Sequence, residues 1–486
     1  MKKHIAALAL GVLTAAGVTE AKVTLPAIIS DNMVLEQGTD ARLWGKADPG
    51  EKITITPSWA AKSPVVTTAG ADGRWVAYLP TPAATADAQT ITFKGKNTVK
   101  VNNVLVGEVW LCTGQSNMLF PVGDHTSELK WQTGMVDAAD QLKDADYPTM
   151  RLFTVPFVVA ADAPEDDCQG RWVLCTPETA YDFSAVGFVF GRTLHNDLKC
   201  PVGLVMSAKG DTHAESWMKP ELMLGNPFYT DVYAGFGRDV VKLSKKPFRI
   251  PSSLWNGMIN PILGYTVKGN IWYQGEANAV RADKYQHVFT TLINSWRQEW
   301  GQPDMPFYFV QIAPFSRQPA EIREAQLDTW QTGLKNIGMV VTTDVGDSLD
   351  IHPRNKAIVG ERLARWALNR DYGRDVACAG PVYRTMSHRD GKIVLTFDNA
   401  PQGLAAPMQG RPTGFFIAGT DRCFVPAEAE IDGNTVIVSS PDVPQPVAVR
   451  YGYDNFFHAD LYNREGLPAS PFRTDRWDAS TVTRRQ

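Results

Sequence analysis

Between residues 104 and 369, apolar stretches alternate with segments of helical periodicity, and this alternation constrains the fold more than any other feature of the chain. The apolar stretches predict six strands, at 104–112, 151–155, 202–207, 268–273, 307–312 and 339–343. Helical spacing of apolar residues predicts helices at 185–198, 283–300, 320–334 and 356–369. Strands that alternate with helices are typical of a parallel sheet covered on both faces. We therefore predict an α/β domain at 104–371, within which residues 125–148 fit neither pattern.

Segments rich in β patterns flank this domain on both sides. Residues 52–56 alternate apolar and polar side chains, and short runs of this kind, separated by turn residues, predict a β-sandwich-like domain at 22–103. Strand patterns at 392–397 and 435–438 predict a C-terminal β module and tail at 372–486. A chain of 486 residues is long enough to bury the cores of several such domains.

The first 21 residues have the organisation of a secretory signal peptide. A basic start is followed by an apolar segment from Ile5 to Val18 and then by small residues, so we expect the mature chain to begin near Lys22. No later segment has the pattern of a transmembrane helix. We therefore expect an exported protein, periplasmic or extracellular, without a membrane anchor.

Composition excludes some classes of function. The 48 Lys and Arg residues are balanced by 52 Asp and Glu residues without a basic run, so the chain lacks the charge pattern of a nucleic-acid-binding protein. None of the six cysteines forms a C-x-x-C pair, which disfavours a zinc knuckle. Export permits disulfides, and pairs Cys168–Cys175 and Cys378–Cys423 are conceivable, although free buried thiols fit the sequence equally well.

A serine follows the first strand of the α/β domain at once. The apolar run 104–112 ends in Thr-Gly-Gln, and Ser116 comes next. Parallel α/β sheets bind ligands beyond the carboxyl ends of their strands, so Ser116 is a candidate nucleophile. Serine also caps helices, and the stretch alone does not separate the two roles.

A nucleophilic serine needs a base, and His352 is the best placed of the eight histidines. It follows the strand predicted at 339–343 and precedes a helix, so it lies beyond a carboxyl strand end, as Ser116 does. Three aspartates upstream can supply the carboxylate that orients its ring. Asp350 is the nearest in sequence, and Asp347 and Asp344 are the alternatives.

The serine also needs hydrogen-bond donors for the oxyanion that forms during acyl transfer. The loop after the strand at 202–207 contains Gly210, whose lack of a side chain lets a backbone N–H approach a ligand. The loop after the strand at 268–273 offers the amides of Gln274 and Asn278. Together with the backbone N–H of Ser116, these groups would form an oxyanion hole.

Several stretches of the chain carry a family resemblance. The sequences GQSNM at 114–118, WYQGEAN at 272–278 and DIHPRNK at 350–356 resemble those of the sialate O-acetylesterases, which belong to the SGNH/GDSL hydrolase superfamily. The flanking sequences DNMVL at 31–35 and GLPASPF at 466–472 are also similar. The resemblance covers nearly the whole chain after the signal peptide.

The resemblance implies a three-layer α/β/α catalytic domain and a serine esterase that removes O-acetyl groups from carbohydrates. O-acetylated sialic acid is the first expected substrate, and acetylated xylan or another polysaccharide is the alternative. Carried over by motif, Ser116 is the nucleophile, His352 the base, and Gly210 and Gln274, or Asn278, the oxyanion donors. No metal or cofactor is needed. Many superfamily members place the acid three residues before the histidine, where this chain has Leu349.

Other classes of function fit the sequence less well. An α/β-hydrolase elbow has the form G-x-S-x-G, and Met118 replaces its second glycine here. A metal hydrolase would need clustered ligands such as H-E-x-x-H, which the chain lacks. A non-catalytic carbohydrate-binding protein would not need Ser116 together with His352 and its nearby acids.

Overall fold

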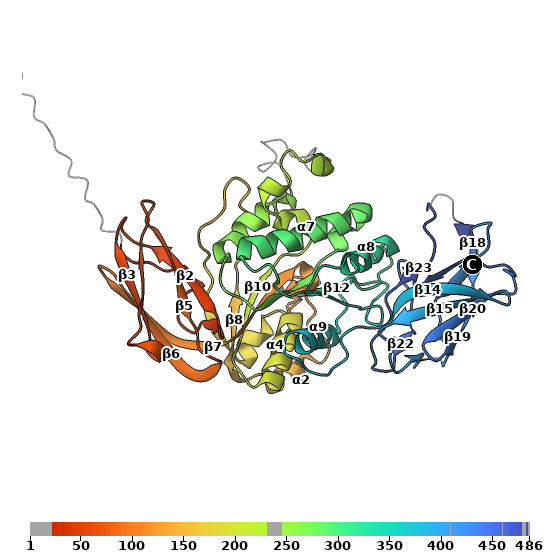
Figure 1. The fold of residues 1–486 in the computed structure, drawn as a ribbon, viewed down its shortest axis with the longest axis horizontal. Helices are drawn as coiled ribbons and strands as arrows, with labels where there is room; N and C mark the ends of the chain where they lie inside the picture. The colour runs from red at the N-terminus through yellow and green to blue at the C-terminus, as the bar shows by residue number, and fades with distance from the viewer. Residues whose placement is uncertain (1–21, 231–244, 409, 459, 479–482, 485–486) are drawn as a thin grey trace, which may run out of the picture.

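The computed structural model describes residues 22–230, 245–408, 410–458, 460–478 and 483–484. Along its longest axis, an N-terminal β region, a central α/β region and a C-terminal β region follow one another (Figure 1). The signal peptide predicted at residues 1–21 lies outside the described residues. Among the helices that are described, none is both long enough and apolar enough to cross a membrane. All six cysteines are free thiols, so neither of the two conceivable disulfides is present.

The central sheet contains the six strands predicted from the alternation. Across the sheet the order is β13 (Ile337–Val340), β12 (Phe307–Val310), β11 (Gly269–Tyr273), β7 (Thr98–Gly114), β10 (Val202–Ala208), β8 (Tyr147–Thr154) and β9 (Trp172–Cys175). The first six are parallel, and β9 is an antiparallel edge strand that the sequence analysis missed. Most of their residues are buried, because helices cover both faces of the sheet.

Two pairs of helices form the outer layers. Helices α7 (Ala282–Trp300) and α8 (Ala320–Trp330) pack together on one side of the sheet, and α4 (Ala185–Leu198) and α9 (Lys356–Arg370) pack together on the other (Figure 1). Short helices α1 (Ser116–Leu119), α2 (Ala138–Lys143) and α3 (Pro177–Tyr181) lie in the connections. The predicted α/β fold with flanking β segments is therefore confirmed.

Three predicted elements end at least two residues earlier than expected, and one of them, β12, stops at Val310. Strand β13 stops at Val340, because the Thr342 hydroxyl donates to the carbonyl of Gln311 at 2.6 Å and the chain turns away from the ladder. Helix α8 stops at Trp330, and Gly333 follows with a φ of +79°, a left-handed conformation that ends helices and favours glycine. Residues 125–148, which fitted no pattern, contain only turns and α2 before β8 begins.

The N-terminal β region is continuous with the central sheet. Its strands are β1 (Val34–Glu36), β2 (Asp40–Lys46), β3 (Lys52–Pro57), β4 (Val65–Thr68), β5 (Arg74–Pro80) and β6 (Thr85–Lys94). Strand β7 pairs with β6 and β1 near its start and with β10 and β11 near its end, so the limit predicted between residues 103 and 104 lies inside one strand. A single hydrophobic core extends through both regions.

The C-terminal β region has a separate hydrophobic core, formed by residues such as Ile393, Val436 and Val449. One larger sheet has the strand order β14 (Val382–Arg389), β15 (Lys392–Asp398), β20 (Thr435–Ser439) and β19 (Glu428–Asp432). The other has the order β23 (Phe472–Arg473), β21 (Ala448–Tyr451), β17 (Phe415–Ala418), β18 (Cys423–Pro426) and β24 (Thr483–Arg484). Strands β16 (Leu404–Ala405) and β22 (Tyr462–Asn463) form a small additional pair.

Candidate active site

Loops that follow four strands of the central sheet meet at its carboxyl edge. Strand β7 leads to Ser116, β10 to Gly210 and β11 to Gln274, and these three strands are neighbours in the sheet. The loop between β13 and α9 carries His352 to the same place, since its ring contacts Ser116. The structure therefore brings together the serine, the histidine and the glycine that the sequence analysis selected.

Ser116 lies within hydrogen-bond distance of His352. Its Oγ is 2.9 Å from Nε2 of the imidazole. Ser116 is the first residue of α1, directly after the turn at Gly114, whose φ is +135°. A Cβ at Gly114 would lie 2.2 Å from the carbonyl oxygen of Tyr273, so only glycine allows the chain to turn so close to β11.

Asp350 is the carboxylate that faces His352. Its Oδ1 lies 3.5 Å from Nδ1 of the imidazole and also accepts a hydrogen bond of 2.8 Å from the backbone N–H of His352. The other two candidate acids lie elsewhere in the loop. Asp347 accepts from the backbone N–H groups of Leu349 and Asp350 at 2.7 and 3.2 Å. Asp344 forms two hydrogen bonds to the guanidinium of Arg362, at 2.8 and 2.7 Å.

The surroundings of His352 keep the imidazole unprotonated. Burial and the nearby ammonium of Lys356 lower the pKa of His352 to about 4, against the opposing effect of Asp350. The ring of Trp131 lies 4.7 Å from the imidazole, centroid to centroid, and the ring of Phe120 lies at 6.4 Å. At neutral pH the ring is therefore free to accept a proton from Ser116.

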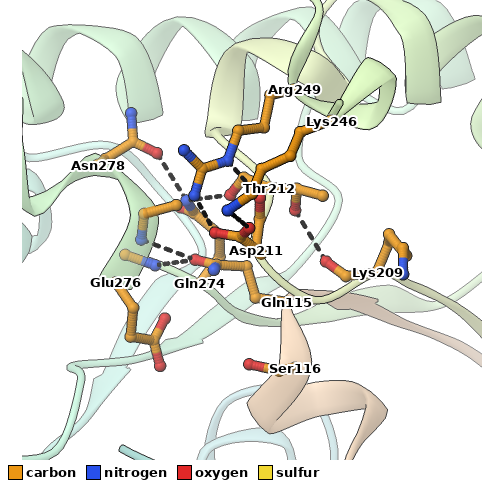
Figure 2. Close-up of polar contacts among 12 residues, drawn as sticks. Gln115, Ser116, Lys209, Asp211, Thr212, Lys246, Arg249, Gln274, Glu276 and Asn278 are labelled. Carbon is orange, nitrogen blue, oxygen red and sulfur yellow. Dashed lines mark hydrogen bonds and ion pairs between the residues drawn. The ribbon is translucent and has the colours of Figure 1, made fainter. Parts of the chain in front are cut away.

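Gly210 lies against the serine. A Cβ at this position would be 3.2 Å from Cβ of Ser116, so a side chain there would crowd the nucleophile. The next residue, Asp211, has a φ of +63°, in the left-handed region that glycine adopts readily and that Asp adopts more often than most other residues. Its carboxylate pairs with Lys246 at 2.6 Å and with Arg249, which holds the loop in place (Figure 2).

The amide groups of Gln274 and Asn278 belong to a buried network beside the serine (Figure 2). Nε2 of Gln274 donates to the carbonyl of Thr212 at 3.2 Å and to Oδ1 of Asn278 at 2.6 Å, so both of its hydrogens are engaged. Nδ2 of Asn278 donates to Glu215 at 2.8 Å. As an oxyanion donor, Gln274 would have to give up one of these bonds.

Three residues of the site had no separate role in the sequence analysis. Oε1 of Gln115 accepts from the backbone N–H groups of Gly275 and Ala277 at 3.1 and 3.4 Å, which ties the turn before Ser116 to the loop after β11. Asn117 and Trp131 contact the loop of His352. Gln115 and Asn117 could have been found from their place in the GQSNM stretch, whereas nothing in the sequence around Trp131 marks it.

The remaining histidines do not contact the serine in the described part of the chain. His125 pairs with Asp182 at 3.1 Å. Burial lowers the pKa of His213 to about 4, and its charged neighbours include Glu215 and Arg281. Over the described ranges, His, Cys, Asp and Glu side chains form no group of three or more that could hold a metal ion.

A serine paired with a histidine and an aspartate, at the carboxyl edge of a parallel sheet, defines the class of α/β serine hydrolases. Comparison with known families agrees with this class. Residues 106–369 match the family of carbohydrate esterases described as sialic acid-specific acetylesterases. The chain belongs to this family and is an esterase.

Relatives along most of the chain support the assignment. The sialate O-acetylesterase of Mus musculus is 28% identical over 91% of this chain and 93% of its own length. The sialate O-acetylesterase of Homo sapiens is 30% identical over 76% of this chain and 75% of its own length. The crystal structure of a novel carbohydrate acetylesterase from Xanthomonas citri is 35% identical, covers 94% of this chain and all of its own, and superposes with a TM-score of 0.82. The resemblance stated from the motifs is therefore confirmed.

Proposed function

We propose that this chain removes acetyl groups from sugar hydroxyls through an acyl-enzyme intermediate formed on Ser116. The observation that supports this most directly is the 2.9 Å contact between Oγ of Ser116 and Nε2 of His352. A serine hydroxyl is a weak nucleophile unless a base removes its proton, and here an unprotonated imidazole lies within reach.

The reaction proceeds in two steps. Ser116 attacks the acetyl carbonyl while His352 takes its proton, and Asp350 stabilises the imidazolium that forms. His352 then gives the proton to the sugar oxygen, which leaves as a hydroxyl. A water molecule, activated by the same imidazole, releases acetate and restores the serine.

The oxyanion is held by the backbone N–H groups of Ser116 and Gly210. N–H groups in the first turn of a helix have no acceptor within the helix, so that of Ser116 is available to a ligand. Gly210 lies against Ser116, and its N–H is the second proposed donor. Gln274 and Asn278 then support the wall of the site, because their amides already bind Thr212 and Glu215.

The proposed substrate is an O-acetylated sialic acid, in line with the names of the relatives, with acetylated xylan or another polysaccharide as the alternative. Arg281 and Arg354 are the candidate partners for the carboxylate of a sialic acid, and both already have hydrogen-bond acceptors in the protein. Arg281 donates to the buried Glu215 at 2.9 Å, and Nε of Arg354 donates to the carbonyl of Gly134 at 2.9 Å. We also propose export to the periplasm or the medium, on the basis of residues 1–21.

Acetate release from acetylated sialosides and from acetylated xylan, measured side by side, tests the substrate. Ser116→Ala tests the mechanism, with circular dichroism as the check on folding. The variant is expected to lose at least about a thousandfold in kcat, since the acyl-enzyme no longer forms. Full activity in a folded Ser116→Ala protein would overturn the mechanism.

A further inference from the structure

Lys356 is a buried cation next to the candidate catalytic pair. It is the first residue of α9, four positions after His352, and its side chain is fully buried. Its Nζ lies 4.8 Å from the ring centre of Phe120 and 5.5 Å from that of Tyr273. Burial and a helix N-terminus both disfavour a positive charge, so this lysine needs specific compensation.

The compensation comes from Asn117 and Glu276. Nζ of Lys356 donates a hydrogen bond to Oδ1 of Asn117. Nδ2 of the same amide donates to Oε1 of Glu276 at 2.6 Å. The second carboxylate oxygen of Glu276 is buried and has no hydrogen-bond partner among the described residues. The amide of Asn117 therefore bridges Lys356 and Glu276, which lie on its two sides.

The same amide joins the nucleophile to the base. Asn117 follows Ser116 directly, and its Nδ2 also donates to the carbonyl of Ile351, the residue before His352, at 3.1 Å. Each hydrogen-bonding atom of this side chain is thus engaged with a different part of the site. The orientation of the amide is fixed, because its oxygen faces the cation and its nitrogen faces the anion.

We propose that Lys356 is a positioning residue, which fixes Asn117 between the serine and the loop of His352 and whose positive charge acts on the imidazole. This inference rests on the proposed roles of Ser116 and His352 and goes beyond them.

The charges around the imidazole determine in which direction Lys356 shifts the protonation of His352. Asp350 favours imidazolium, whereas burial and Lys356 disfavour it, and Trp131 and Phe120 contribute no charge. Glu276 faces Lys356 from the loop after β11. Burial lowers the pKa of Lys356 to about 7, against the opposing charges of Glu276 and Asp350. Lys356 is therefore charged throughout the range in which His352 titrates.

The test is the variant Lys356→Met, which keeps most of the side-chain volume and removes the charge. We expect the pKa of His352 to rise by about one unit or more, because a nearby like charge has been removed. The pKa is followed by NMR on protein with ¹³C-labelled histidine, with the His352→Gln spectrum used for assignment. The acidic limb of kcat/KM should move upward by the same amount, and kcat should fall about 10- to 100-fold through loss of positioning.

Two further variants separate charge from structure. Lys356→Arg keeps the charge, and we expect the pKa of His352 to stay near its original value. Arg362→Met removes another buried cation from the same helix, one that binds Asp344 and the carbonyl of Val341. It should destabilise the fold and leave the titration of His352 unchanged. If Lys356→Met does not fold, Lys356→Gln removes the charge and retains a hydrogen-bond donor for Asn117.

An unchanged pKa of His352 in the folded Met or Gln variant would overturn the inference, as would an equal shift in Arg362→Met. The NMR titration does not depend on turnover. If the unmodified protein released acetate from no ester, the proposed function would fail, and the titration would still show whether Lys356 controls the imidazole.

Discussion

Two aspartates of one loop, Asp350 and Asp344, have opposite surroundings. The side chain of Asp350 is 44% exposed and lies 3.5 Å from Nδ1 of His352. The side chain of Asp344 is 12% exposed and meets the guanidinium of Arg362 through two short hydrogen bonds, although it follows β13 more closely. Both lie within eight residues before the base, and the sequence ranks Asp350 first only because it is nearer to His352.

The comparison explains why we propose the weaker contact, that of Asp350, for the reaction. A carboxylate that is already neutralised by a guanidinium stabilises an imidazolium much less than an unpaired carboxylate does. In the proposed mechanism, Asp350 faces a neutral ring in the resting protein and gains an ion pair only when His352 accepts the serine proton. Asp344 instead joins the loop to α9 and lies close to Tyr462 of the C-terminal β region. Burial and the nearby Asp344 carboxylate raise the pKa of the Tyr462 phenol to about 12.

Among the three aspartates of the loop, the largest effect on catalysis is expected from Asp350→Asn. The amide keeps the shape of the side chain but removes the charge that stabilises the imidazolium, so kcat should fall about 100- to 10,000-fold. Because this carboxylate is nearly half exposed, the free energy of unfolding should change by less than about 1 kcal/mol. Steady-state kinetics and thermal unfolding on the same preparation measure both quantities.

The matched variant Asp344→Asn should give the reverse result. It leaves the buried guanidinium of Arg362 without its counter-charge, which should lower the free energy of unfolding by about 2–3 kcal/mol. We expect kcat to change by less than about threefold, since Asp344 does not contact His352. A large loss of kcat in Asp344→Asn at unchanged stability would show that Asp344, and not Asp350, is the carboxylate that acts on His352.

The pH profile of kcat/KM also distinguishes Asp350 from Asp344. Because His352 must be unprotonated to act as a base and its pKa is about 4, activity should be lost only as the pH falls through about 4. Asp350 raises this pKa, so Asp350→Asn should move the acidic limb to lower pH. Asp344→Asn should leave the limb in place. An acidic limb near the ordinary histidine value of about 6.5 in the unmodified protein would contradict the environment described for His352.

The sequence predicted those parts of the fold that depend on local periodicity. Helix α4 has the predicted limits, 185–198, and β10 and α9 differ from prediction by one residue. The limit between the N-terminal and central regions was harder to predict, because β7 runs through it as one continuous strand, even though Asn103, at that limit, has a φ of +53°. Strand β9 was missed because an edge strand of four residues has little periodicity to detect.

The candidate site was predictable where a residue follows its own strand. Ser116, Gly210 and His352 were found in this way. The choice among Asp350, Asp347 and Asp344 depends on how a loop of irregular backbone folds, and the position of Trp131 depends on contacts between distant segments. Neither is encoded in a local pattern.

Asp347 should give modest effects on both activity and stability, and it completes the comparison. Its carboxylate accepts from the backbone N–H groups of Leu349 and Asp350, so it shapes the turn that presents Asp350 to the base. Asp347→Ala should lower kcat about 3- to 10-fold and cost about 1 kcal/mol of stability, because two hydrogen bonds of an exposed turn are lost. Asp347→Asn keeps an acceptor oxygen at the same place and should retain nearly full activity. If the Asn variant lost as much activity as Asp350→Asn does, the charge of Asp347 would act on His352 directly, and Asp350 would be the residue that shapes the turn.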